Sequence, residues 1–170
     1  KQFQKAALLA IQLKATIGEN DCHQYRPFSL SSELRETVVK YCTRDPSVLE
    51  EIAQSYGYPI NVWNVSKIQN FSYVFECHPY FNEYVGSWSM SQATDLSTMF
   101  RCAFSFNTDI SAWDTGSVVN MEGMLSGAHE FNQDISSWNT RKVTDMSSMF
   151  AKAYRFNRSL SQWNTSQVQN

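Results

Sequence analysis

The sequence predicts an α/β repeat solenoid, with one short parallel strand and one short helix in each 25-residue coil and an α-helical cap before the first coil. Three observations support this fold class. The five tryptophans of the 170-residue chain are all spaced 25 residues apart, apolar residues recur at fixed distances from each of them, and the residues before the first tryptophan carry helix start and stop signals. The tryptophans are Trp63, Trp88, Trp113, Trp138 and Trp163.

The helical cap is predicted for residues 1–57. Asp45–Pro46 has the character of a helix N-cap followed by a first helical residue, and Gly57 is a stop signal for the same helix. Two further helices are expected, over residues 3–17 and over residues 31–41. We expect these helices to cover the exposed end of the first coil, since a terminal coil without a cap would expose its core.

The solenoid is predicted for residues 58–170, about four and a half coils, with a C-terminal end that is open or truncated. The residues 5, 8, 12 and 15 positions after each of the first four tryptophans, all apolar except His78, have the spacing of one helical face, which predicts a short helix. The residues that lead into each tryptophan are rich in β-branched and aromatic types, which predicts a short strand. Polar residues suited to N-caps precede the helical face, at Asn70, Asp95, Asn120 and Asp145.

A Phe-Asn pair also recurs in every coil. The pairs begin at Phe81, Phe106, Phe131 and Phe156. We expect the phenylalanines to lie in the core and the asparagines to form a buried ladder that hydrogen-bonds backbone groups of adjacent coils.

Composition excludes several classes of partner. Lys and Arg number 14 against 16 Asp and Glu, so the net charge of −2 does not favour nucleic acid or an anionic membrane. The longest apolar run, over residues 6–11, is far shorter than the ~20 residues of a membrane span. Aromatic residues reach 14% while charged residues are 18%, so the chain has apolar surface to bury in a core or against a partner.

No catalytic, cofactor or metal motif is present in the sequence. The three histidines, His23, His78 and His129, are not part of an H-E-x-x-H pattern, and there is no glycine-rich phosphate loop and no C-x-x-C motif. The sequence therefore predicts a protein that is not an enzyme and binds no cofactor or metal.

The cysteines form two candidate pairs. Cys77 and Cys102 are 25 residues apart and so occupy the same point of neighbouring coils. Adjacent strands lie about 4.8 Å apart, within the Cα separation that a disulfide tolerates, although two free thiols or a metal site are alternatives. Cys22 and Cys42 are a second candidate disulfide, within the cap. Two such pairs favour an oxidising compartment.

Asn64 and Asn164, each just after a tryptophan, are candidate glycosylation sites within N-x-S/T sequons. They would carry glycan only if the protein is secreted.

The repeated phrase resembles the 25-residue repeat of the BspA-like leucine-rich-repeat surface proteins, FNxDISxWxTSxVTxMxxMF. Residues 131–150, FNQDISSWNTRKVTDMSSMF, match this pattern closely, and the resemblance covers about residues 58–170. Residues 33–64 also look like the helical lead-in that precedes such arrays, notably in unicellular algae. The first coil departs from the pattern, since Val74–Phe75 replaces Met-Phe. The resemblance implies a surface or secreted repeat protein used for attachment or assembly, without catalytic residues.

The functional prediction is a non-catalytic repeat module for protein–protein or protein–glycan interaction, at the cell surface or secreted, and used in attachment or assembly. The alternative is a structural accessory subunit embedded in a larger multiprotein complex, in an organelle. The expected partners are proteins, within a large assembly in the second case, with glycan as a further ligand class. Outward positions that vary between coils are candidates for the partner surface: Glu83, Tyr84, Thr108, Asp109, Gln133, Asp134, Arg158 and Ser159.

Overall fold

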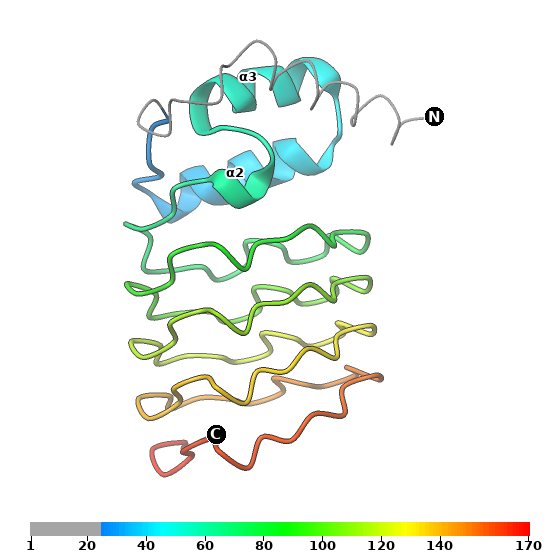
Figure 1. The fold of residues 1–170 in the computed structure, drawn as a ribbon. Coiled ribbons are helices and arrows are strands. Elements are labelled where there is room, and N and C mark those ends of the chain that lie inside the picture. The colour runs from blue at the N-terminus through cyan, green and yellow to red at the C-terminus, as the bar shows by residue number, and fades with distance from the viewer. Residues whose placement is uncertain (1–24) are drawn as a thin grey trace.

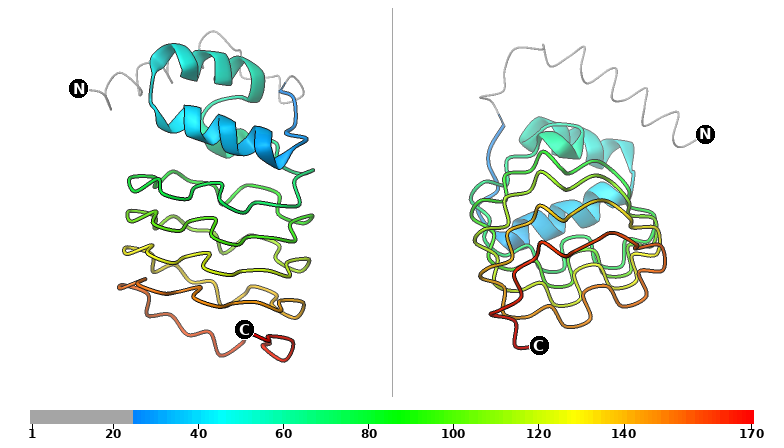
Figure 2. Two further views of the ribbon diagram at one scale, coloured as in Figure 1. Left: turned by 180° about the vertical axis from the view of Figure 1, so that it is seen from behind. Right: turned by 60° about the horizontal axis from the view of Figure 1, so that its bottom comes forward.

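The computed structural model describes residues 25–170, which form a helical cap followed by a stack of coils (Figure 1). The cap contains α2 (Ser31–Cys42), α3 (Pro46–Tyr56) and the 3₁₀ turn η1 (Ile60–Val62). α2 lies next to the first coil, and α3 packs on the side of α2 that faces away from the coils (Figures 1 and 2). The helix predicted over residues 3–17 lies outside the described residues.

The start and stop signals of α3 are confirmed. The side chain of Asp45 accepts hydrogen bonds from the amides of Ser47 (2.9 Å) and Val48 (3.4 Å), two of the amides that have no partner inside the helix. Gly57 ends the helix at a φ of 89°, a left-handed value that a residue with a Cβ rarely adopts.

The cap and the first coil share one apolar core built around Trp63. Phe28 stacks on Tyr56 at a ring-centroid distance of 4.1 Å and lies 5.2 Å from Trp63. Tyr41, from α2, meets the same indole edge-on at 5.3 Å. All four rings are buried, so the cap covers the first tryptophan of the series as the sequence predicts.

The coils begin at residues 63, 88, 113 and 138, and the start of a fifth follows from residue 163 (Figure 2). Equivalent aromatic side chains stack along the axis of the stack. Phe106 lies 6.2 Å from Phe81 and 5.7 Å from Phe131, and Trp138 lies 6.2 Å from both Trp113 and Trp163. The burial of the repeated apolar positions therefore agrees with the sequence.

The secondary structure of the coils differs from the one that the sequence predicts. The prediction of an α/β repeat solenoid with a strand and a helix per coil is wrong. Residues 25–170 contain no strand, and both of their α-helices belong to the cap. β-Pairing between coils within the described residues is limited to three isolated parallel bridges, which join Asn70 to Asp95, Asp95 to Asn120 and Asn120 to Asp145. The coils consist of consecutive turns and irregular backbone.

Left-handed residues prevent the predicted helix in each coil. The segments 72–77, 97–102, 122–127 and 147–152 are runs of turns, and the second and sixth residue of each run has a positive φ of 52–74°. These residues are Tyr73, Cys77, Thr98, Cys102, Gly123, Gly127, Ser148 and Lys152. A right-handed helix cannot pass through such a residue, so the polypeptide turns out of the helical path every four residues.

Hydrogen bonds between coils compensate for the missing helix. In the first run, the amides of Tyr73, Phe75 and Cys77 donate to carbonyls of the second coil at 2.8–3.3 Å, whereas the amides between them donate back three residues within their own coil. The second and third coils repeat this alternation. Apolar side chains at a spacing of three and four thus reach the core without a helix.

Asparagine side chains replace the predicted strand ladder. The amide of Asn107 donates to Oδ1 of Asn82 (2.8 Å), and the amide of Asn132 donates to Oδ1 of Asn107 (2.9 Å). The amide of Asn157 continues the series to Asn132 at 3.0 Å. The expected ladder therefore exists, but its asparagines are half-buried or exposed rather than buried. A side-chain oxygen takes the amide that a strand would pair with a backbone carbonyl, so no regular sheet forms.

Candidate functional site

Half of the predicted partner surface is used inside the stack. Nε2 of Gln133 donates to the carbonyl of Asn107 (2.7 Å), and Nε of Arg158 donates to the carbonyl of Asn132 (2.8 Å). Thr108 makes a longer bond of the same kind, to the carbonyl of Glu83 (3.4 Å). These side chains satisfy backbone groups of the preceding coil, which accounts for their placement without a partner.

Glu83, at the same position in the first coil, joins the cap to the stack. Its carboxylate accepts a hydrogen bond from the hydroxyl of Tyr41 (2.5 Å) and forms an ion pair with Arg44. Burial, and then the adjacent Glu83 carboxylate, raise the pKa of Tyr41. No sequence pattern predicts this contact, since Tyr41 and Arg44 lie about 40 residues before Glu83.

The neighbouring column of the predicted surface is exposed and contains Tyr84, Asp109, Asp134 and Ser159. Asp109 and Asp134 accept from the backbone amides of Ser111 (2.9 Å) and of the equivalent serine one coil on (3.0 Å). These hydrogen bonds lower the pKa of both carboxyl groups. The structure thus leaves one of the two predicted columns open to a partner.

The cysteines of the described residues are free thiols, so the prediction of a Cys77–Cys102 disulfide is not supported. The predicted pairing assumed that both residues lie in adjacent strands. Instead, both have left-handed φ values, and the amide of Cys77 donates to a carbonyl of the second coil from within a run of turns. Cys42 is also a free thiol, and its candidate partner Cys22 lies outside the described residues.

The thiols of Cys42 and Cys77 differ in environment, so we expect them to differ in their rate of alkylation. Burial raises the pKa of Cys42 to about 12, whereas Cys77 is exposed. Because the thiolate is the reactive form, we expect iodoacetamide at pH 8 to alkylate Cys77 at least ~10-fold faster than Cys42. Peptide mapping of a time course measures both rates, and equal rates would contradict the burial of Cys42.

Both candidate glycosylation sites are exposed and adopt the same local turn. Oδ1 of Asn64 accepts from the amide of Ser66 (3.2 Å), and Oδ1 of Asn164 accepts from the amide of Ser166 (3.0 Å). Each asparagine is therefore accessible but already oriented by the serine of its own sequon.

An exposed aromatic column was missed by the sequence analysis. Phe104, His129 and Tyr154 occupy the same position of successive coils, 16 residues after each tryptophan. Phe104 and His129 stack at 4.6 Å with an interplanar angle of 6°, and Tyr154 lies 4.8 Å from His129. Phe104 is 41% exposed and Tyr154 is 73% exposed. The 25-residue spacing of these three residues was the available signal. The first coil has Pro79 at this position, so the aromatic series is interrupted there.

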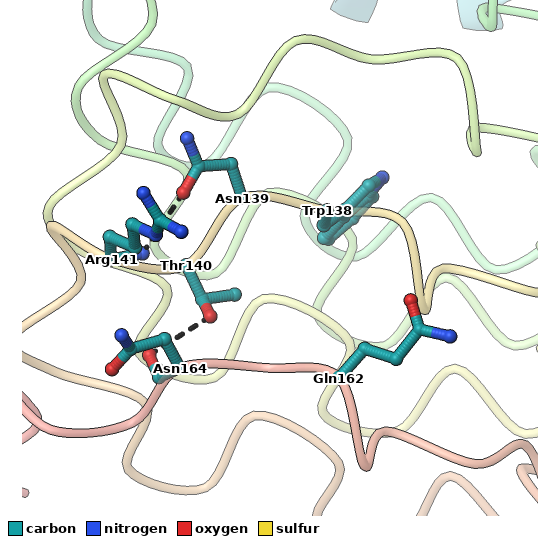
Figure 3. A pocket seen from close by; sticks show the side chains of 6 residues that line it. All are labelled: Trp138, Asn139, Thr140, Arg141, Gln162 and Asn164. Carbon is teal, nitrogen blue, oxygen red and sulfur yellow. Dashed lines mark hydrogen bonds between the residues drawn. The ribbon is translucent and has the colours of Figure 1, made fainter.

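A polar hollow of about 370 Å³ lies between the fourth coil and the start of the fifth (Figure 3). Its lining residues are Trp138, Asn139, Thr140, Arg141, Gln162 and Asn164. The hydroxyl of Thr140 donates to the carbonyl of Asn164 (3.0 Å), which joins the two coils beneath the hollow. The side chains of Asn139, Arg141 and Gln162 surround it (Figure 3).

Two further properties bear on chemistry. Within residues 25–170 no three His, Cys, Asp or Glu side chains come together in a way that could hold a metal ion. No helix in the described part of the chain has the length and apolar character needed to cross a bilayer.

The comparisons with known proteins give one family. A family model matches residues 33–118 and again residues 80–170, which together cover most of the chain. No curated protein and no solved structure matches it. The matched family is a repeat family known from BspA-like surface proteins. The chain therefore belongs to the family described as "Mycoplasma protein of unknown function, DUF285".

Proposed function

We propose that the chain is a non-catalytic module that binds another protein through its aromatic column, at a cell surface or in a secreted assembly. The single observation that carries this proposal is the stacked column of Phe104, His129 and Tyr154, in which Phe104 and Tyr154 are exposed and His129 is half-buried between them. Large aromatic side chains dominate the binding energy of protein interfaces, because each buries a large area at a small cost in conformational entropy.

The backbone beneath the column is held in place before any partner arrives. The amides of Ser105, Glu130 and Arg155 donate to the carbonyls of the column position one coil earlier, at 2.9–3.1 Å. A rigid support reduces the ordering cost of binding, so more of the contact energy appears as affinity. The ion pair between Arg155 and Glu130 (2.9 Å) lies beside the column and would form part of a polar rim.

The family and the repeat pattern support the location. The phrase FNQDISSWNTRKVTDMSSMF of residues 131–150 resembles the repeat of BspA-like leucine-rich-repeat proteins. Within this proposal, the chain is a BspA-like surface module, and the coils position the column without contributing catalysis.

A photo-crosslinking residue at position 154 tests the proposal and identifies the partner. The captured protein, once purified, is expected to bind Phe104→Ala and Tyr154→Ala variants about 30-fold more weakly than the wild-type chain. The measurement is a Kd from calorimetry or interferometry, after circular dichroism has shown that each variant is folded.

Val119→Ala is the matched control, because Val119 is an exposed apolar residue at a different position of the coil. It is expected to leave the Kd unchanged. Equal affinity of the wild-type chain and both column variants for the captured protein would refute the proposal.

A further inference from the structure

The polar hollow between the fourth and fifth coils has the dimensions of a ligand site. Its volume of about 370 Å³ falls within the range of roughly 300–1,000 Å³ that is typical of small-molecule pockets. Side chains from two successive coils line it, and the Thr140–Asn164 hydrogen bond fixes the distance between those coils (Figure 3).

The acceptors around the hollow are largely occupied, and the donors are not. Oδ1 of Asn139 accepts from the amide of Arg141 (3.3 Å), Oδ1 of Asn164 accepts from the amide of Ser166 (3.0 Å), and the carbonyl of Asn164 accepts from Thr140. The two asparagine Nδ2 groups and the Arg141 guanidinium remain as donors. No carboxylate lines the hollow.

Arg141 distinguishes this coil from the others. The equivalent residues are Ser66, Ser91, Gly116 and Ser166, and Arg141 is followed by Lys142, also exposed. Neither Arg141 nor Lys142 takes part in the ion pairs found within residues 25–170. An arginine in a repeat position that otherwise holds serine or glycine, without an acidic partner, provides an uncompensated positive charge beside the hollow.

We propose that this hollow binds an acidic saccharide. The Arg141 guanidinium would bind the carboxylate of a uronic acid through paired N–H donors, and the side-chain amides of Asn139, Gln162 and Asn164 would hydrogen-bond the ring hydroxyls. A peptide is a poorer fit, because the lining is polar and Trp138 is only 3% exposed, so an apolar anchor would have little surface to contact.

The saccharide would be a second ligand of the binding module proposed above. This inference rests on the proposed function only in treating the chain as a non-catalytic binding module. The hollow lies at repeat positions different from those of the aromatic column. Loss of partner binding in the column variants would test one proposal, and loss of saccharide binding in an Arg141 variant would test the other.

The experiment measures binding of three probes to the wild-type chain by calorimetry and by NMR. The probes are a galacturonic acid hexasaccharide, the same oligosaccharide with its carboxyl groups reduced to alcohols, and an aspartate-rich peptide of similar charge. We expect the acidic hexasaccharide to bind at least ~10-fold more tightly than either of the other probes, because only it combines carboxylates with ring hydroxyls.

Arg141→Gln is expected to weaken binding of the acidic hexasaccharide at least ~10-fold, with no change in Tm because the side chain is exposed. Lys67→Gln is the matched control: Lys67 is exposed at the position of Lys142 in the first coil, and its removal changes the net charge equally. Three results would overturn the proposal: equal binding of the reduced oligosaccharide, equal binding of the acidic peptide, or equal losses in the two variants, which would indicate non-specific charge attraction.

Discussion

Replacing Trp113 by alanine is expected to lower the free energy of unfolding by about 3–5 kcal/mol, the largest effect of any single core substitution considered. The indole is 4% exposed, lies 6.2 Å from Trp138 and 6.1 Å from Phe100, and donates from Nε1 to the carbonyl of Val85 (3.0 Å). The substitution leaves a cavity and an unpaired buried carbonyl, and it weakens contacts with both neighbouring coils. Because each coil contacts only its neighbours, the loss is not shared by distant parts of the stack.

Trp163→Ala is the matched control for that experiment. Trp163 makes the equivalent Nε1 bond, to Ile135, and the equivalent stack on Trp138, but it is only partly buried. Its removal is expected to cost less than half as much. Urea denaturation followed by circular dichroism gives both values, and equal losses would show that the tryptophan series does not stabilise the stack through burial.

The cap and the core positions were predictable from the sequence because their signals are local or strictly periodic. The helix signals are local: Asp45 and Pro46 lie at the start of α3 and Gly57 at its end, and such caps act within a single turn. The tryptophan and phenylalanine series have a fixed period, so the burial of their members up to Trp138 and Phe131 followed directly. Neither inference required a prediction of the backbone path.

The backbone path of the coils was not predictable from apolar spacing alone. A spacing of three and four residues describes a helical face, but it equally describes two successive turns that share a left-handed residue. The sequence did hold one signal, since Gly123 and Gly127 occupy both left-handed positions of the third coil, while other coils place Tyr73 and Cys102 there. Bonds between coils make the left-handed conformation tolerable in those non-glycine residues, and these bonds appear only in the assembled stack.

Half of the predicted partner surface makes contacts inside the stack for a related reason. Variation between coils predicts freedom to bind a partner, but Gln133 and Arg158 differ in type while each donates to a carbonyl of the preceding coil. Different side chains can satisfy one backbone acceptor, so variability does not separate a binding residue from a structural one.

The stack has a direction, and this determines what its cap must supply. Amides of each turn segment donate to the carbonyls of the following coil, so the first coil has carbonyls that no earlier coil reaches. Ser72, equivalent to the acceptor Ser97, receives Nε of Arg35 at 2.6 Å instead. The carbonyl oxygen of Glu76, equivalent to that of Arg101, lies 2.8 Å from Nδ1 of His78. The cap therefore provides the Arg35 donor for Ser72 in place of an amide of a preceding coil, whereas the carbonyl of Glu76 is contacted by a side chain of the first coil itself.

Arg35→Met is expected to lower the free energy of unfolding by about 2–3 kcal/mol, because it removes a charged donor from a buried acceptor while keeping a long side chain. Arg35 also donates to the side chains of Asn70 (2.7 Å) and Ser72 (2.9 Å), so the substitution removes three hydrogen bonds at once. Lys40→Met, at an exposed position of α2, removes the same charge and should cost no more than ~0.5 kcal/mol.

Amide hydrogen exchange in the Arg35→Met variant adds a spatial test. Protection should fall first in α2 and the first coil, while the third and fourth coils keep theirs. A loss of protection spread evenly over all coils, or equal costs for Arg35→Met and Lys40→Met, would mean that the cap does not hold the first coil through these bonds.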